Sequence, residues 1–224
     1  MGKRFTNAQK EINANKVYPI AEALALAKKT ATTKFVGNIE VHARLGIDAK
    51  KTDQSVRATL TLPYGTGKIR RIIAFVSSGH EQEALSAGAT IAGGEELIKK
   101  IKETEQLNFD MAIAEPAMMP KLAIIAKLLG PRGLMPNPKS GTVNPDVAKV
   151  VKEFASGKTE FKNDDSGNVH MILGKSNFAD EQILANYKTF IDALSAAKPS
   201  GVKKEFIMSV VMNATMGPGI KVKI

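Results

Sequence analysis

The chain has 224 residues, of which 43% are hydrophobic and 24% charged, and its formal net charge at pH 7 is +10. A chain of this length can bury a sizeable core as one large domain or as two, and its positive charge favours nucleic acid or an anionic membrane as partner. Because the chain has no cysteine, disulfides and metal sites with thiolate ligands are excluded.

The first third of the chain predicts one helix and two strands. Residues 19–29 (PIAEALALAKK) begin with Pro19, and proline is favoured at the first position of a helix. Residues 37–47 (GNIEVHARLGI) and 55–62 (SVRATLTL) alternate apolar and polar side chains. Alternation of this kind is typical of strands with one buried and one solvated face, as in antiparallel sheets.

The middle of the chain follows a different pattern, in which short apolar runs alternate with helices. Residues 72–76 (IIAFV) and 111–114 (MAIA) are nearly all apolar, which indicates strands buried on both faces. Helical patterns occupy 81–89 (EQEALSAGA), 93–103 (GGEELIKKIKE), 116–129 (PAMMPKLAIIAKLL) and 145–156 (PDVAKVVKEFAS). Strands and helices in this order predict a parallel α/β sheet.

The last third returns to alternation. Strand patterns lie at 159–164 (TEFKND), 168–173 (NVHMIL), 204–212 (KEFIMSVVM) and 220–224 (IKVKI). Between them, residues 179–198 carry a helical stripe formed by Ile183, Leu184, Tyr187, Phe190, Ile191 and Leu194. This region therefore predicts antiparallel strands packed against a long helix.

Two glycine-containing segments, 63–68 (PYGTGK) and 156–158 (SGK), separate these regions and are predicted to be hinges. We therefore predict a discontinuous α+β domain, residues 1–66 plus 158–224, and an inserted α/β domain, residues 67–157. The outer domain carries +8 of the net charge and the inserted domain +2. We expect the outer domain to lay two helices on one face of a four-stranded antiparallel sheet, which leaves the other face free for a partner.

No motif in the sequence indicates chemistry on a substrate. GTGK (65–68) is not a phosphate loop, since Ile69 follows where that loop requires Ser or Thr. The three histidines, His42, His80 and His170, lie far apart and form no metal-binding motif. We therefore predict that the protein is not an enzyme and binds neither a metal nor a cofactor.

Two segments have compositions typical of binding surfaces. The loop Gly130–Thr142 (GPRGLMPNPKSGT) is rich in Gly and Pro and unusually long for a small α/β domain. It either has a binding or domain-contact role or is only a stiff crossover. In TTKFVGN (32–38), Lys34 places a cation beside the aromatic ring of Phe35. Such a pair can contact a phosphate and stack on RNA, although composition alone favours a core position for Phe35.

Four segments together resemble the bacterial large-subunit ribosomal protein L-one family: KFVGNIEVHARLGIDAKKTDQSVRATLTLPYGTGK, LGPRGLMPNPKSGTV, EFKNDDSGNVHMILGK and SVVMNATMGPGIKVKI. The resemblance runs from about residue 5 to the end of the sequence. It implies the same split-domain organisation, with a Rossmann-like parallel-sheet insertion, and a structural role in the large subunit of the cytoplasmic ribosome. It further implies binding to the rRNA of the mobile lateral stalk, a part in moving exit-site tRNA, and translational repression through the protein's own operon mRNA.

The resemblance also implies an RNA-binding surface on the split domain, around the turn TMGPG (215–219). The residues expected on it are Lys34, Phe35, Asn38, Glu40, Ser209, Thr215, Met216, Gly217 and Pro218, together with Lys158, Asn163, His170 and Lys175. In the turn, glycine lets the backbone approach RNA closely, Pro218 fixes the geometry, and Met216 can lie against a sugar or base. Thr215 offers a hydroxyl to a 2′-OH or a phosphate, and Glu40 is expected to accept hydrogen bonds from 2′-OH or base amino groups.

Two alternative functions remain open from the residues alone. A nucleotide- or sugar-binding enzyme would use the inserted domain, but it requires a phosphate loop or a carboxylate cluster that the sequence does not contain. A membrane-surface protein requires a basic amphipathic helix, whereas the two longest helical patterns have nearly neutral polar faces. We expect neither a membrane partner nor an obligate protein oligomer.

Overall fold

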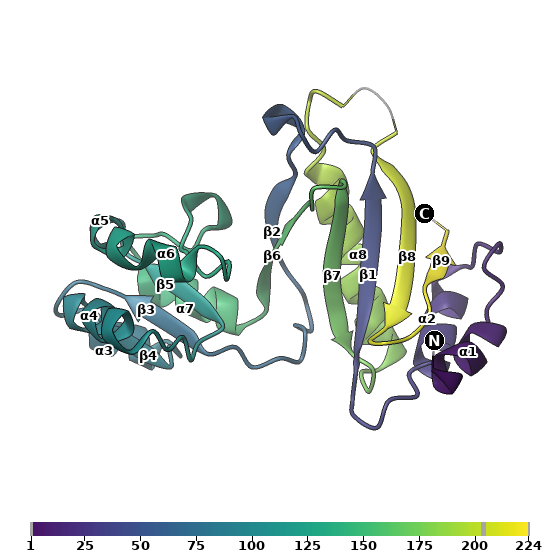
Figure 1. The fold of residues 1–224 in the computed structure, drawn as a ribbon, viewed down its shortest axis with the longest axis horizontal. Helices are drawn as coiled ribbons and strands as arrows, with labels where there is room; N and C mark the ends of the chain where they lie inside the picture. The colour runs from purple at the N-terminus through teal and green to yellow at the C-terminus, as the bar shows by residue number, and fades with distance from the viewer. Residues whose placement is uncertain (1, 203–204, 224) are drawn as a thin grey trace. The chain divides into compact units, whose positions relative to one another are not determined.

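The computed structural model describes residues 2–202 and 205–223, and its internal contacts divide the chain into two compact units (Figure 1). Unit 1 comprises the chain up to Gly67 and from Thr159 onward, and unit 2 comprises Lys68–Lys158. Each unit has its own hydrophobic core. That each one folds independently as a domain stays a prediction.

Unit 1 is built on a four-stranded sheet with the order β7-β1-β8-β9, in which every neighbouring pair is antiparallel. Its strands are β1 (Asn38–Leu45), β2 (Arg57–Thr61), β6 (Lys158–Lys162), β7 (Asn168–Lys175), β8 (Ile207–Ala214) and β9 (Ile220–Val222). Its helices are α1 (Lys3–Lys10), α2 (Ile20–Lys29), the short 3-10 helix η1 (Thr52–Gln54) and α8 (Asp180–Ala196). The predicted antiparallel α+β architecture is confirmed.

The two longer helices cover one face of this sheet, because they and the strands share one core. The apolar residues of β1, including Ile39, Val41 and Ala43, are fully buried in that core. Helix α8 contacts β7, while α2 contacts β8 and β9, and the two helices contact each other (Figure 1). The other face of the sheet carries the alternate side chains of each strand, and no helix formed by residues 2–202 and 205–223 packs on it.

Two of the alternating segments do not join the four-stranded sheet. Strands β2 and β6 instead form a separate two-stranded sheet, tied by an ion pair between Arg57 and Glu160. Next to them, the amide oxygen of Asn163 accepts a hydrogen bond from the backbone N–H of Val56 at 2.8 Å. This side chain therefore has a structural role that its sequence context does not reveal.

Unit 2 contains a three-stranded parallel sheet with the order β4-β3-β5. The strands are β3 (Ile72–Phe75), β4 (Ile91–Gly93) and β5 (Met111–Ala114). The helices are α3 (Glu81–Ser86), α4 (Glu95–Thr104), η2 (Pro116–Met118), α5 (Met119–Leu122), η3 (Ala123–Ile125), α6 (Ala126–Leu129), η4 (Pro138–Ser140) and α7 (Val147–Ala155). Residues of α3 and α7 pack on one face, while α4 and the segment 116–129 pack on the other, as expected for a doubly wound α/β unit.

Three local elements differ from their sequence patterns. Strand β4 was not predicted, because its three residues gain strand structure only by pairing with β3. Helix α1 was not predicted either, since its sequence is almost entirely polar. The expected helix at 116–129 is divided into short α and 3-10 segments. Pro116 and Pro120 lie within it, and each removes a backbone N–H donor.

Candidate nucleic-acid interface

The uncovered face of the sheet in unit 1, which we call the open face, carries polar side chains from all four strands. They are Asn38, Glu40, His42 and Arg44 on β1, Asn168 and His170 on β7, Ser209 and Asn213 on β8, and Lys221 on β9. Their positions follow from the register, which pairs His42 with both His170 and Val211, and Arg44 with both Asn168 and Ser209. Two exposed apolar side chains, Ile172 and Met208, interrupt this polar surface.

A chain of hydrogen bonds crosses the open face from one strand to the next. His42 Nδ1 lies 2.7 Å from His170 Nδ1, and His42 Nε2 lies 2.6 Å from Asn213 Oδ1. His170 Nε2 lies 3.3 Å from Asp164 Oδ2, in the turn before β7. The surface is therefore an ordered polar network. Of its members, the sequence predicted only His170 as a site residue.

Asp164 anchors one end of this chain as an ionised carboxylate. The backbone N–H of Asn168 donates to it at 2.7 Å, and the side chain of Asn168 and the backbone of Ser166 also donate. These bonds, with that from His170, hold the pKa of Asp164 far below its ordinary value despite partial desolvation. Asp164 is consequently a fixed negative charge at the edge of the open face.

The TMGPG turn is joined to the open face through Thr215. Its hydroxyl donates to Glu40 Oε1 at 2.8 Å and accepts from the backbone N–H of Asn38 at 3.0 Å. The backbone N–H of Thr215 also donates to the Asn38 carbonyl at 2.9 Å. Asn38, Glu40 and Thr215, three of the predicted site residues, therefore form one hydrogen-bonded group, and Thr215 is engaged within the protein itself.

The turn itself holds one residue in a left-handed conformation. That residue is Met216, with φ of 61°, and its side chain is 67% exposed at the tip. Gly217 donates its N–H to the Ala214 carbonyl at 2.7 Å and closes the turn. Pro218 is buried, so it fixes the conformation of the turn and does not present its side chain to solvent. The left-handed conformation in this turn thus falls on Met216 and not on Gly217 or Gly219.

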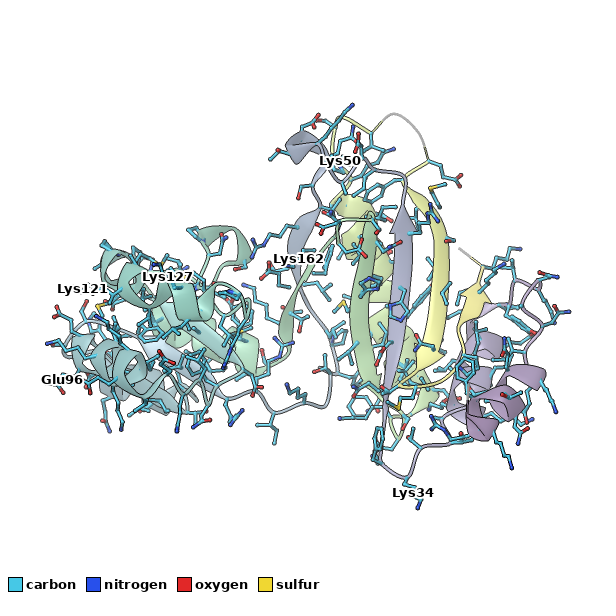
Figure 2. All side chains as sticks on the ribbon, in the orientation of Figure 1. Lys34, Lys50, Glu96, Lys121, Lys127 and Lys162 are labelled. Atoms are coloured by element: carbon cyan, nitrogen blue, oxygen red, sulfur yellow. The ribbon has the colours of Figure 1, made fainter. Side chains whose placement is uncertain are left out.

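The loop before β1 lies beside this turn. A Cβ added to Gly37 would lie 3.3 Å from Thr215 Cβ, so the end of the loop packs directly on the turn. Phe35 is 57% exposed, and its carbonyl accepts a hydrogen bond from the Thr33 hydroxyl. Lys34 stands at the tip of the loop with its side chain directed away from the ribbon (Figure 2). Phe35 is thus not a core residue.

The three remaining predicted site residues, Asn163, Lys158 and Lys175, lie at three different places in the structure. Asn163 holds the segment before β2, as described above. Lys158 belongs to unit 2, where its ammonium contacts Glu153 Oε2 at 2.7 Å and lies 5.5 Å from the centre of the Phe154 ring. Lys175 ends β7 opposite Asn38, at the turn end of the sheet. Only Lys175 is therefore placed together with the group around Thr215.

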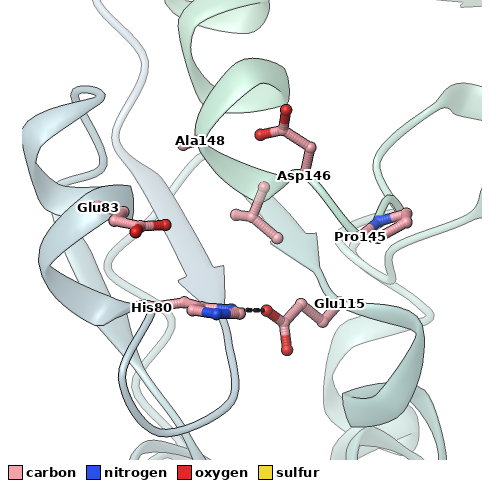
Figure 3. Close-up of a pocket in the computed structure, with 7 residues that line it drawn as sticks. His80, Glu83, Glu115, Pro145, Asp146 and Ala148 are labelled. Carbon is pink, nitrogen blue, oxygen red and sulfur yellow. Dashed lines mark hydrogen bonds and ion pairs between the residues drawn. The ribbon is translucent and has the colours of Figure 1, made fainter.

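Unit 2 has a crevice of about 450 Å³ at the carboxyl ends of β3 and β5, lined by His80, Glu83, Glu115, Pro145, Asp146, Val147 and Ala148 (Figure 3). Glu115 Oε1 lies 2.6 Å from His80 Nδ1 and Oε2 accepts from Ser77. Burial favours the neutral acid, but these hydrogen bonds outweigh it and lower the pKa of Glu115, and the same contact raises the pKa of His80. A crevice bordered by three carboxylates is unsuited to a phosphate group.

The chain matches one protein family over most of its length. The family model described as "Ribosomal protein L1p/L10e family" matches residues 27–218. The chain belongs to this family. It is 48% identical to the "Large ribosomal subunit protein uL1" of Mycoplasma capricolum subsp. capricolum, over 100% of this chain and 98% of the relative. It is 46% identical to proteins of the same name from Thermosipho africanus (98% of this chain, 95% of the relative) and Chloroflexus aurantiacus (99% and 94%).

Membership of the ribosomal protein L1p/L10e family confirms the predicted family. The family consists of ribosomal structural proteins, so the alternative of a nucleotide- or sugar-binding enzyme is set aside. Family members work on the ribosome, which in bacteria lies in the cytoplasm.

None of the helices within residues 2–202 and 205–223 has the length and hydrophobicity that a membrane span requires. Among the same residues, no group of His, Asp and Glu could hold a metal ion.

Proposed function

We propose that the protein is a structural constituent of the large ribosomal subunit and binds the rRNA of the mobile lateral stalk through unit 1. The observation that carries the proposal is the uncovered sheet face, which adjoins a turn with an exposed apolar tip. RNA recognition commonly uses a sheet surface with stacking side chains beside groups that bind the 2′-OH and phosphate. The open face supplies the polar groups, and Phe35 and Met216 supply the apolar contacts.

The distribution of charge supports this choice of surface. Unit 1 holds 19 Lys and Arg against 12 Asp and Glu, a net charge of +7, whereas unit 2 holds 13 against 10, a net charge of +3. Arg44 and Lys221 lie on the open face itself, and Lys34 extends from the adjoining loop. A polyanion therefore meets its most favourable potential at unit 1.

The proposal includes two finer roles that the resemblance to the family implies. The first is a part in moving deacylated tRNA out of the exit site, as the stalk moves with its bound protein. The second is repression of the protein's own operon, in which an mRNA segment occupies the same open face. Because one face cannot hold both RNAs, the mRNA segment and the stalk rRNA must compete for the protein.

The experiment measures the affinity of the full chain for a stalk rRNA fragment, with nucleotide and liposome controls. Ser209 is exposed on the open face opposite Arg44. Ser209→Glu places a negative charge there, which repels the phosphates, and should weaken binding by about tenfold or more. Ser195 is exposed on α8, the helix on the covered face. Ser195→Glu makes the same change there and should bind as wild type. Equal losses in both variants would show that the open face is not the site.

A further inference from the structure

The hydrogen-bond chain on the open face fixes where its protons lie. The side-chain nitrogen of Asn213 donates to the Ala214 carbonyl at 3.0 Å, so its oxygen is the atom that faces His42 Nε2. An amide oxygen only accepts, and therefore His42 Nε2 carries a hydrogen. At the other end, the carboxylate of Asp164 only accepts, so His170 Nε2 carries a hydrogen as well.

This assignment leaves the two Nδ1 atoms facing each other at 2.7 Å. In two neutral imidazoles whose Nε2 atoms are protonated, both Nδ1 atoms present lone pairs, and lone pairs at that distance repel. If both rings were cationic, two N–H groups would face each other instead. With a hydrogen on each Nε2, one added proton between the two Nδ1 atoms makes this contact a hydrogen bond.

We propose that His42 and His170 share one proton across the open face, and that this shared charge strengthens RNA binding. The inference rests on the proposed function, and it adds His42 as a positioning residue that the sequence did not indicate. His170 is the more exposed ring, at 53% of its side chain against 32% for His42. His170 is therefore the ring that meets an RNA phosphate, and His42 holds the proton in place beneath it.

Four charged side chains lie on or beside the open face near the pair. Asp164 faces His170 from the turn before β7, and Glu40 Oε2 lies 3.9 Å from His42 Nε2 on β1. Two cations lie on the same face. Arg44 comes two residues after His42 on β1, and Lys221 on β9 pairs with Val211 of β8, which in turn pairs with His42. Strand β8 contributes Ser209, Val211 and Asn213 to this face, none of which titrates. Asp164 and Glu40 therefore lie close to the pair, whereas Arg44 is two residues along β1 from His42 and Lys221 is two strands away.

The proposal predicts that RNA affinity depends on pH over the range in which histidine changes charge, about pH 5 to 8. At low pH the pair carries its proton, and at high pH the proton is lost and the facing lone pairs push the rings apart. Loss of one phosphate contact in 0.1 M salt corresponds to about a fivefold weaker affinity. We therefore expect wild-type affinity for stalk rRNA to fall by about that factor between pH 5.5 and 8.5.

Variants of His42 separate a positioning role from a merely structural one. His42→Leu removes both hydrogen bonds and should weaken the pH dependence, since His170 alone then carries it. His42→Gln keeps one acceptor for His170 and one donor for Asn213, so it should restore the pH dependence. His80→Gln removes the third histidine, which lies in unit 2, and should leave the profile unchanged. A His42→Leu profile parallel to that of wild type, at lower affinity, would overturn the proposal.

A second measurement tests the shared proton without RNA. The ¹⁵N chemical shifts of the imidazole rings in the free protein should show one hydrogen shared between His42 Nδ1 and His170 Nδ1, and its signature should be absent in His42→Leu. Tight RNA binding that is independent of pH would overturn this inference and leave the proposed function standing. No RNA binding at any pH would overturn the proposed function, whatever the ¹⁵N shifts show.

Discussion

Thr215 holds Glu40 in place on the open face, by donating its hydroxyl hydrogen to Glu40 Oε1 over 2.8 Å. Both residues were expected to meet RNA directly, and the bond between them changes what each one does. One oxygen of Glu40 is occupied by Thr215, so Oε2 is the atom left to accept from a 2′-OH or a base amino group. We therefore propose that Thr215 influences RNA binding through the orientation of that carboxylate.

Replacing Thr215 with Ala should weaken RNA binding without unfolding the protein. The change frees Glu40 and removes the hydroxyl that accepts from Asn38 N, so we expect roughly 1–3 kcal/mol less binding free energy and a smaller loss of stability. Thr215→Ser keeps the hydroxyl and should bind like wild type. Affinity should fall at every salt concentration with the same salt slope, since no phosphate contact is removed. Filter binding across a salt series would decide this, and unchanged affinity for Thr215→Ala would contradict it.

Replacing Gly217 with Val should destabilise the turn by steric conflict. A Cβ at this position would lie 3.0 Å from the Ala214 carbonyl oxygen, which belongs to the backbone and cannot turn aside. We expect a cost of about 1–3 kcal/mol in unfolding free energy and a clear loss of RNA affinity. Met216→Asn is the matched control, because Asn tolerates the left-handed conformation that Met216 adopts. Thermal unfolding should show a lower Tm for Gly217→Val and an unchanged Tm for Met216→Asn.

The stability of unit 2 should fall in acid through Asp110. The backbone N–H of Arg71 and the ammonium of Lys68 hydrogen-bond this carboxylate and lower its pKa from 3.8 to about 2. A pKa lowered by folding contributes stability that is present above 3.8 and is lost as pH falls towards 2. Because Lys68 and Arg71 are themselves more than half exposed, we expect only about 1 kcal/mol.

Asp110→Asn should therefore reduce the unfolding free energy at pH 7, and the difference from wild type should shrink as the pH approaches 3. Denaturant unfolding at several pH values measures this difference. Asp165→Asn changes an exposed carboxylate in unit 1 and serves as the control. A constant difference between Asp110→Asn and wild type at all pH values would show that the hydrogen bonds, and not the charge, are responsible.

Unit 1 should fold and bind stalk RNA without unit 2. Its core cluster is drawn entirely from residues 18–62 and 161–222, so unit 2 contributes no residue to that core. We expect residues 1–67, joined to 159–224 by a short linker, to melt cooperatively and to retain most of the RNA affinity. Residues 68–158 alone should fold on their own two clusters and bind weakly. A folded unit 1 with little affinity would show that the RNA site lies elsewhere.

Sequence reasoning predicted those parts of the fold that depend on local pattern. The alternation in β1 and the stripe on α8 each reflect burial of one face, and the structure buries the expected residues, Ile39, Val41, Ile183 and Phe190 among them. Strand β4 has no such pattern, since it is only three residues long and depends on β3 for its hydrogen bonds. Local propensity is weak where tertiary pairing decides the structure.

The candidate site could be predicted only in part, for a similar reason. Thr215 and Glu40 were expected on the interface, but their bond joins residues 175 positions apart. The partnership of His42 with His170 and Asn213 depends on the register of three strands. Irregularities shift that register after Ile39 and after Arg44, and a shift of one residue would turn these side chains to the other face. No feature of the sequence alone fixes it.

The strand order also sets the sequence in which the molecule can form during synthesis. Strand β1 lies in the middle of its sheet, between β7 and β8, both of which are translated more than 100 residues later. Until they emerge, β1 has no partner, whereas unit 2 is continuous in sequence and can complete its sheet first. We therefore expect the nascent chain to carry a folded unit 2 beside an unpaired β1. The open face should accordingly be completed only after β8 and β9 have been synthesised.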